Sequence, residues 1–136
     1  MIVVDINTIA YLYLEGEQTV LAEQVLRKDS EWLVPRLWRS EFRNVVALYL
    51  RRKILALEEA LRICQKAERF LIPNEIEVPS PSVLGLILSS DCSAYDCEFV
   101  ALAQHMQAPF ITSDKKLLRR FPDTALSLKQ FTESNT

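Results

Sequence analysis

Residues 2–12 read IVVDINTIAYL, a short run of β-branched residues followed by an acid and a helical segment. Ile2 to Val4 are all apolar, which is typical of a strand that is buried on both faces of a sheet. Asp5 follows this strand directly. In sheets built from strand–helix units, functional groups gather at the carboxyl ends of the strands. We therefore expect Asp5 to be a functional carboxylate, although Asp is also a common helix cap.

Short apolar strands and helices alternate along the rest of the chain. Further strands are predicted at 32–34, 76–78, 110–112 and 125–128, and helices at 7–14, 17–28, 37–52, 57–71, 82–88, 93–107 and 114–120. This alternation predicts an α/β fold with a central, mainly parallel sheet of about five strands flanked by helices. The length of 136 residues, without a repeat or a linker, predicts a single domain spanning residues 1–136.

Composition excludes several classes of protein. The three cysteines are an odd number without metal-ligand spacing, so we expect a reducing compartment and neither a disulfide framework nor a zinc site. The N-terminus has no basic segment before its apolar run, and no stretch approaches the ~18 apolar residues of a membrane span. These features predict a cytoplasmic protein that does not contact a membrane. With only two glycines, Gly16 and Gly85, the chain contains no Gly-rich phosphate loop.

Basic residues gather in two segments, although the formal net charge is −2. One segment contains Arg36, Arg39, Arg43, Arg51, Arg52 and Lys53, and the other contains Lys115, Lys116, Arg119 and Arg120. Basic clusters on a mildly acidic chain suit a polyanion-binding surface around an acidic pocket. A solvated helix face is the alternative interpretation.

Glu41 lies within an apolar face of the helix predicted at 37–52. Residues three and four positions away share its face, and these are Leu37, Trp38, Asn44 and Val45. A buried carboxylate without a basic partner is costly, so a metal ion is the natural partner for it. The alternative is a partly exposed Glu at the edge of the stripe. Asn44, one turn further on, is a candidate for orienting a metal ligand by hydrogen bonding.

Asp96 and Asp114 both stand at predicted helix starts, where an acid can serve as a cap. Ser93 and Asp96 resemble a capping box, with Asp in place of the usual Glu. Asp96 also shares its helix face with apolar Phe99 and Val100, so it is expected to point toward the sheet. Asp114 can cap the helix that follows it. The neighbouring residues 112 and 113 supply hydroxyl oxygens for a metal or a phosphate.

Oxygen ligands of this kind favour hard divalent cations such as Mg²⁺ and Mn²⁺. A metal offsets the repulsion between neighbouring carboxylates, and it can activate water and neutralise charge on a phosphodiester. We find no Ser–His–Asp triad of familiar form. His105, the single histidine, lies late in a predicted helix, where we interpret it as structural or exposed.

Four strings of this sequence together resemble the acidic motifs of PIN domains, and most closely those of VapC-type toxins of prokaryotic toxin–antitoxin modules. They are VVDINTIAYL at 3–12, LWRSEFRNVV at 37–46, CSAYDCEFVALA at 92–103 and TSDKKLL at 112–118. The resemblance covers nearly the whole chain in the expected order. It implies a PIN-like three-layer fold and an Mg²⁺- or Mn²⁺-dependent endoribonuclease. It also implies a homodimer and inhibition by a small antitoxin protein.

The resemblance carries over to individual residues. Asp5, Glu41 and Asp96 match the three core acids, and Asp114 matches the fourth, more variable acid. Asn7 and Ser113 fall where such proteins often place a polar helper.

On this hypothesis the chain hydrolyses RNA, with the four acids as catalytic and metal-binding residues. The residues expected to hold the RNA backbone are Arg36, Arg39, Lys115 and Lys116. The alternative is a PIN-like RNA- or protein-binding module without catalytic activity. A receiver-like phospho-acceptor is disfavoured, because no mid-chain Asp follows a predicted strand.

Overall fold

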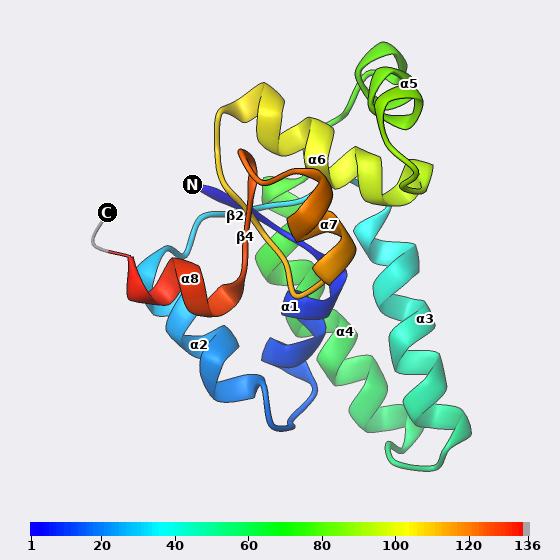
Figure 1. The fold of residues 1–136 in the computed structure, drawn as a ribbon. Coiled ribbons are helices and arrows are strands. Elements are labelled where there is room, and N and C mark those ends of the chain that lie inside the picture. Colours follow the sequence, from blue (N-terminus) through cyan, green and yellow to red (C-terminus); the bar gives the residue numbers. More distant parts are fainter. Residues whose placement is uncertain (135–136) are drawn as a thin grey trace.

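A computed structural model describes residues 1–134 as a parallel four-stranded sheet with helices around it (Figure 1). The strands are β1 (Ile2–Val4), β2 (Trp32–Leu33), β3 (Phe110–Ile111) and β4 (Ala125–Leu126), in the spatial order β2-β1-β3-β4. The helices are α1 (Ile6–Tyr13), α2 (Thr19–Lys28), α3 (Trp38–Arg51), α4 (Leu57–Leu71), the 3₁₀ helix η1 (Ile72–Asn74), α5 (Ser80–Ser89), α6 (Ala94–Met106), α7 (Lys115–Arg120) and α8 (Leu128–Glu133).

The first strand is the centre of the sheet, as its uninterrupted apolar sequence predicts. Its three residues are buried, and it pairs in parallel with β2 through Val3 and Leu33 and with β3 through Val4 and Ile111. The chain therefore adds β2 on one side of β1 and the later strands on the other. In such sheets the direction in which successive strands are added reverses at a switch point, which lies here between β1 and β3. A crevice opens there, beyond the carboxyl ends of the strands.

Helices cover the sheet from both sides in the view of Figure 1, with α5 and α6 above the strands and α1 and α2 below them. The apolar residues of α6 supply much of the core, and the ring of Phe99 stacks on Phe110 of β3 at a centroid distance of 6.1 Å. The helices α3 and α4 pack on each other and project beyond the sheet as a hairpin. This arrangement brings the first turns of α3 and α6 near the carboxyl ends of β1 and β3.

The predicted strand at 76–78 is wrong, and the described sheet has four strands rather than five. A single parallel bridge forms instead, between Val34 and Glu75, the residue that precedes this segment. In this bridge the Ile76 N–H donates to the Val34 carbonyl at 3.0 Å. Pro79 lacks an N–H with which to extend the ladder, and α5 begins at the next residue.

The predicted last strand, 125–128, ends earlier than expected, at Leu126. Ser127 caps α8, a helix that the sequence pattern did not indicate, through a reciprocal capping box with Gln130. The expected domain, residues 1–136, extends two residues beyond the described part of the chain. No helix within residues 1–134 combines the length and the apolar character needed to cross a membrane.

Glu75 is the polar anchor between the start of α3 and the end of the α4–η1 segment. Its side chain is only 13% exposed, and its two oxygens accept hydrogen bonds from Arg39 Nε at 2.6 Å and Arg39 Nη2 at 2.7 Å. The indole N–H of Trp38 donates to the same carboxylate at 2.7 Å. The Arg39 guanidinium holds the pKa of Glu75 below its ordinary value. This bidentate pair fixes the first turn of α3, from which Glu41 projects.

Replacing Glu75 with Gln should destabilise the fold by about 1–3 kcal/mol, because a half-buried guanidinium then loses its charged partner. Urea unfolding followed by circular dichroism measures the change. Glu77→Gln is the matched control, since the Glu77 side chain is 90% exposed and stands 3.8 Å from an exposed Arg36. Equal stability of the two variants would contradict a structural role for the Glu75 pair.

Candidate active site

Asp5 stands at the carboxyl end of β1, and it is also the cap of α1. Its backbone N–H donates to Ile111 of β3 at 3.2 Å, and its Oδ1 accepts from the backbone N–H and the hydroxyl of Thr8 at 2.8 and 2.7 Å. Its Oδ2 accepts from the Thr112 hydroxyl at 2.5 Å. Burial raises the pKa of Asp5, while these hydrogen bonds act in the opposite direction. Asp5 can therefore be both a helix cap and a functional carboxylate, because the same side chain caps α1 and faces the switch point.

Glu41 is half-buried on the first turn of α3, and its Oε1 is the one buried side-chain N or O atom within residues 1–134 that lacks a hydrogen-bond partner. Burial raises the pKa of Glu41 to about 7, and the negative charges of Asp96 and Asp5 add to the increase. The charge of Glu98 acts on Glu41 in the same direction. A carboxylate that is buried, unpaired and repelled by its neighbours needs a cation or a proton.

Asp96 lies in the first turn of α6, where Ser93 rather than Asp96 is the cap. The Ser93 hydroxyl accepts from the Asp96 backbone N–H at 3.1 Å. Burial raises the pKa of Asp96, and the charge of Asp114 raises it further, while Ser93 and the Lys116 ammonium lower it. Asp114 therefore belongs to the same group of acids, although β3 separates it in sequence from α6.

Asp114 caps α7, which is one of the two roles that the sequence indicates for it. Its Oδ1 accepts from the backbone N–H groups of Lys116 and Leu117 at 2.8 and 3.2 Å. Its own backbone N–H donates to the Thr112 hydroxyl at 3.0 Å. Because the cap uses only Oδ1, the Oδ2 of Asp114 accepts no hydrogen bond from residues 1–134 and remains available to a ligand.

The donor set suits a hard divalent cation, since it consists of carboxylate oxygens and includes the unpartnered Oε1 of Glu41. Within residues 1–134, no three His, Cys, Asp or Glu side chains are arranged so that they could hold a metal ion as they stand. Mg²⁺ is usually held by one or two carboxylates and several waters, so a cage of three protein ligands is not required. The residues present therefore fit such an ion.

The residues that orient the acids differ from those expected from sequence. Asn7 and Asn44 are exposed, and neither side chain makes a hydrogen bond with another residue of the described chain. The buried hydroxyls of Thr8 and Thr112 hold Asp5 instead. The sequence indicates Thr112 only as an oxygen ligand for a metal or a phosphate, and no local pattern marks Thr8 for this role. Ser113, the other expected helper, has its hydroxyl 3.2 Å from that of Tyr11 on α1.

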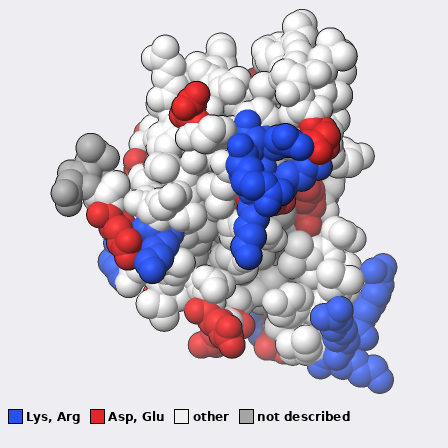
Figure 2. Space-filling view, viewed as in Figure 1, with Lys and Arg blue, Asp and Glu red and all other residues white. Residues whose placement is uncertain are grey.

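Basic side chains form a patch over the position of α7, directly beside acidic ones (Figure 2). On this helix Lys115 is exposed, whereas Lys116 donates to the Asp91 carbonyl at 2.7 Å. Arg36 is 72% exposed and stands 3.8 Å from Glu77. Arg39 is held in its pair with Glu75. Of the four candidates for binding a polyanion, Arg36 and Lys115 are therefore the freer ones.

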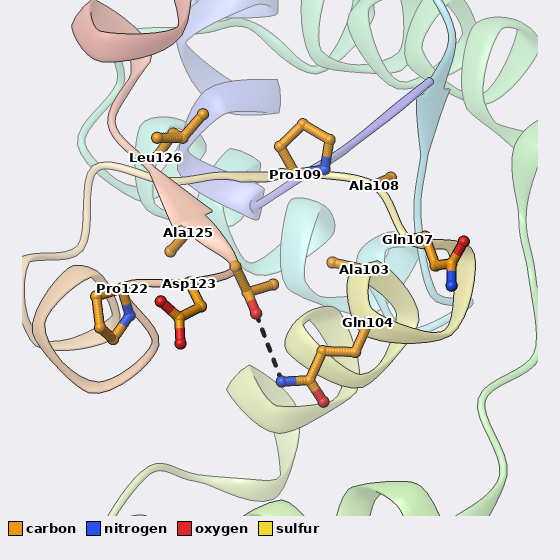
Figure 3. A pocket seen from close by; sticks show the side chains of 10 residues that line it. Ala103, Gln104, Gln107, Ala108, Pro109, Pro122, Asp123, Ala125 and Leu126 are labelled. Carbon is orange, nitrogen blue, oxygen red and sulfur yellow. Dashed lines mark hydrogen bonds between the residues drawn. The ribbon is translucent and has the colours of Figure 1, made fainter.

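A separate hollow of about 450 Å³ lies at the opposite end of the sheet, between the end of α6 and β4 (Figure 3). Gln104 spans it to the Thr124 hydroxyl at 3.5 Å, and Asp123 is the only charged side chain among its lining residues. This hollow is remote from the four acids, and its lining contains no second titratable side chain beside Asp123 with which to form a catalytic pair.

An all-parallel α/β sheet with carboxylates gathered at its switch point defines the class of this protein. The chain belongs to the PIN domain family, whose model matches residues 2–123. It is similar to Ribonuclease VapC3 of Pyrobaculum aerophilum, with 28% identity over 125 residues that cover 89% of this chain and 95% of that protein. The crystal structure of PAE2754 from the same organism has the same fold, with a TM-score of 0.71, 16% identity and coverage of 96% of this chain and 92% of that one.

The raised pKa of Glu41 predicts that the metal-free protein loses stability as the pH rises. The folded state holds a proton on Glu41 up to about pH 7, whereas the unfolded chain releases it near 4.5. The stabilisation is therefore complete below the unfolded pKa of Glu41 and is lost as the pH rises through its folded pKa. Because the side chain is only half-buried and solvent screens its charge, the loss is discounted to roughly 2 kcal/mol. Thermal unfolding in EDTA across this range measures the loss.

Glu41→Gln should make this pH dependence shallower, because the neutral amide does not titrate. Asp5 and Asp96, whose pKa values are also raised, still contribute to it. Glu17→Gln, at an exposed acid, is the control and should follow the wild type. A wild-type slope that survives unchanged in Glu41→Gln would show that other groups carry the pH dependence.

Proposed function

We propose that this chain is a metal-dependent endoribonuclease that hydrolyses RNA phosphodiester bonds, and that it is the toxin of a type II, VapBC-like toxin–antitoxin system. The observation that carries the proposal is the buried, unpartnered oxygen of Glu41 amid the charges of Asp5 and Asp96. Membership of the PIN domain family and the similarity to a protein named a ribonuclease support it.

In this proposal Asp5, Glu41 and Asp96 bind Mg²⁺ or Mn²⁺, and Asp114 completes the site directly or through water. When bound, the ion would offset charge on the phosphodiester and favour ionisation of a water. Thr112 and Thr8 keep Asp5 in one orientation, since three hydrogen bonds from their side chains and backbone restrain it. Glu41, whose pKa is about 7 without a cation, is able to hold or release a proton near neutral pH.

The RNA backbone would lie along the basic residues that border the acids. In this proposal Arg36 and Lys115 contact phosphates directly, which their exposure supports. Lys116 contributes its charge beside Asp96 while it is held by Asp91. Arg39 would contribute by holding α3 in its orientation, because its guanidinium already donates hydrogen bonds to Glu75. Phosphate contacts of this kind make binding salt-sensitive.

The biological setting follows from the same family relationship. We propose a cytoplasmic protein that a small antitoxin inhibits and that acts as a homodimer. Leu84 and Leu88, one turn apart on α5, are 59% and 91% exposed and offer an apolar face for self-association. A short neighbouring reading frame that encodes a DNA-binding protein would support the toxin role.

Asp5→Asn and Glu41→Gln should each reduce metal-dependent RNA cleavage by at least about a hundredfold, because each removes a charged ligand from the ion. Cleavage of a labelled RNA in Mg²⁺ or Mn²⁺ is the measurement, and excess EDTA should abolish it. Asp123→Asn is the control, since this exposed acid lies at the opposite end of the sheet.

Full activity of either variant, or undiminished activity in EDTA, would refute the metal mechanism. RNA binding without cleavage by the wild type in Mn²⁺ would instead favour a non-catalytic binding module. Growth arrest on expression, relieved by Asp96→Asn, is the corresponding observation in cells.

Asp114 can be tested separately from its capping role. Asn caps a helix about as well as Asp, so Asp114→Asn should leave the free energy of unfolding within about 0.5 kcal/mol, whereas Asp114→Ala should cost about 1 kcal/mol. If the carboxylate serves the metal site, both variants lose activity although only the alanine variant loses stability. Wild-type activity in Asp114→Asn would reduce Asp114 to a helix cap.

A further inference from the structure

A groove of about 470 Å³ lies beside the acids, and the proposed cleavage chemistry does not use most of its lining. It is formed by Leu37, Ser40, Glu41 and Asn44 of the α3 segment and by Tyr95 of α6. The α3 residues are spaced so that they occupy one face of the helix. Glu41 is shared with the acid group, so the groove opens directly onto the site.

Tyr95 is the unusual member of this lining. It immediately precedes Asp96, yet its side chain is 63% exposed. Within residues 1–134 its ring makes no aromatic contact and its hydroxyl no hydrogen bond, so packing does not explain an aromatic residue here. A free aromatic face next to a group of carboxylates is a surface on which a planar ligand can stack.

The opposite wall offers hydrogen-bonding groups rather than a continuous apolar surface. Ser40 and Asn44 lie one turn apart on α3 and are exposed, and their side chains have no hydrogen-bonding partner among residues 1–134. The amide of Asn44 both donates and accepts, which matches the edge of a nucleobase. Arg43, on the same helix, faces α4 instead, where it stands 3.8 Å from Glu68.

We propose that this groove holds an unpaired RNA base, stacked on Tyr95 with its edge toward Asn44, while the adjoining phosphodiester lies at the acids. This inference rests on the proposed function and specifies its substrate as single-stranded RNA. A base within a duplex is already stacked and paired, so it cannot reach Tyr95. Leu37 is the one aliphatic side chain of the lining, which favours a planar, polar ligand over an apolar peptide segment.

The test compares Tyr95→Leu, which removes the aromatic face, with Tyr95→Phe, which keeps it. Binding is measured by fluorescence anisotropy with a labelled single-stranded RNA and with the same RNA annealed to its complement. Glu41→Gln is introduced in every sample to prevent cleavage. Tyr95→Leu should weaken single-strand binding roughly tenfold, and Tyr95→Phe less than about twofold, with duplex binding unchanged. Leu57→Ala, at a similarly exposed apolar residue of α4, is the control.

Cleavage kinetics of the same substitutions with Glu41 intact provide a second readout. Tyr95→Leu should raise KM more than it lowers kcat, because the ring contacts a base rather than the reacting atoms. Unchanged binding in Tyr95→Leu, an equal loss in Tyr95→Phe, or an equal loss for duplex RNA would overturn the stacking subsite. A changed elution volume on gel filtration with unchanged RNA binding would assign the groove to a second protein copy and also overturn it.

The outcomes separate the two proposals. Wild-type protein that binds single-stranded RNA through Tyr95 but never cuts it would refute the nuclease and keep the subsite. Cleavage that is indifferent to Tyr95 would keep the nuclease and refute the subsite, and protein that binds no RNA would refute both.

Discussion

The hydroxyl of Thr112 joins the two central strands at the point on which the acid group depends. It donates to Asp5 Oδ2 and accepts from the backbone N–H of Asp114, so one oxygen atom connects the acid that follows β1 with the acid that follows β3. The backbone bond between Asp5 and Ile111 holds the strand ends together beneath it. From this junction α1 and α7 start in directions that their own acid caps determine. The positions of two carboxylates are thus consequences of strand pairing and not of flexible loops.

The other two acids reach the junction from helices, and they carry most of its electrostatic cost. Glu41 projects from a turn of α3 that the pair between Arg39 and Glu75 fixes, and Asp96 from a turn of α6 that Ser93 caps. Burial and like charge both disfavour their ionised forms. A fold that keeps such an arrangement forgoes stability at its switch point, as is common where binding or catalysis requires a preorganised charge.

Local patterns in the sequence were sufficient for most of the helices and strands and for proposing Asp5 and Glu41, whereas Asp114 was proposed mainly from the resemblance to PIN domains. The apolar run before Asp5 indicated a central strand, and helical spacing indicated that Glu41 faces the interior. Contacts between distant segments could not be inferred in this way. The bond between Thr112 and Asp5, and the pair that removes Arg39 from the free basic surface, link residues far apart along the chain. The apolar pattern at 76–78 also failed, because an adjacent proline and a new helix left room for only one bridge.

The four proposed catalytic acids come from the β1–α1 junction, α3, α6 and the start of α7, and this dispersal matters during synthesis. A growing chain on the ribosome already contains Asp5 and Glu41, but β3 and Thr112, which set the geometry of Asp5, are made much later. The complete group can assemble only after Asp114 has left the exit tunnel and β3 has paired with β1. Translation thus separates the synthesis of Asp5 and Glu41 from the completion of the acid group to which they belong.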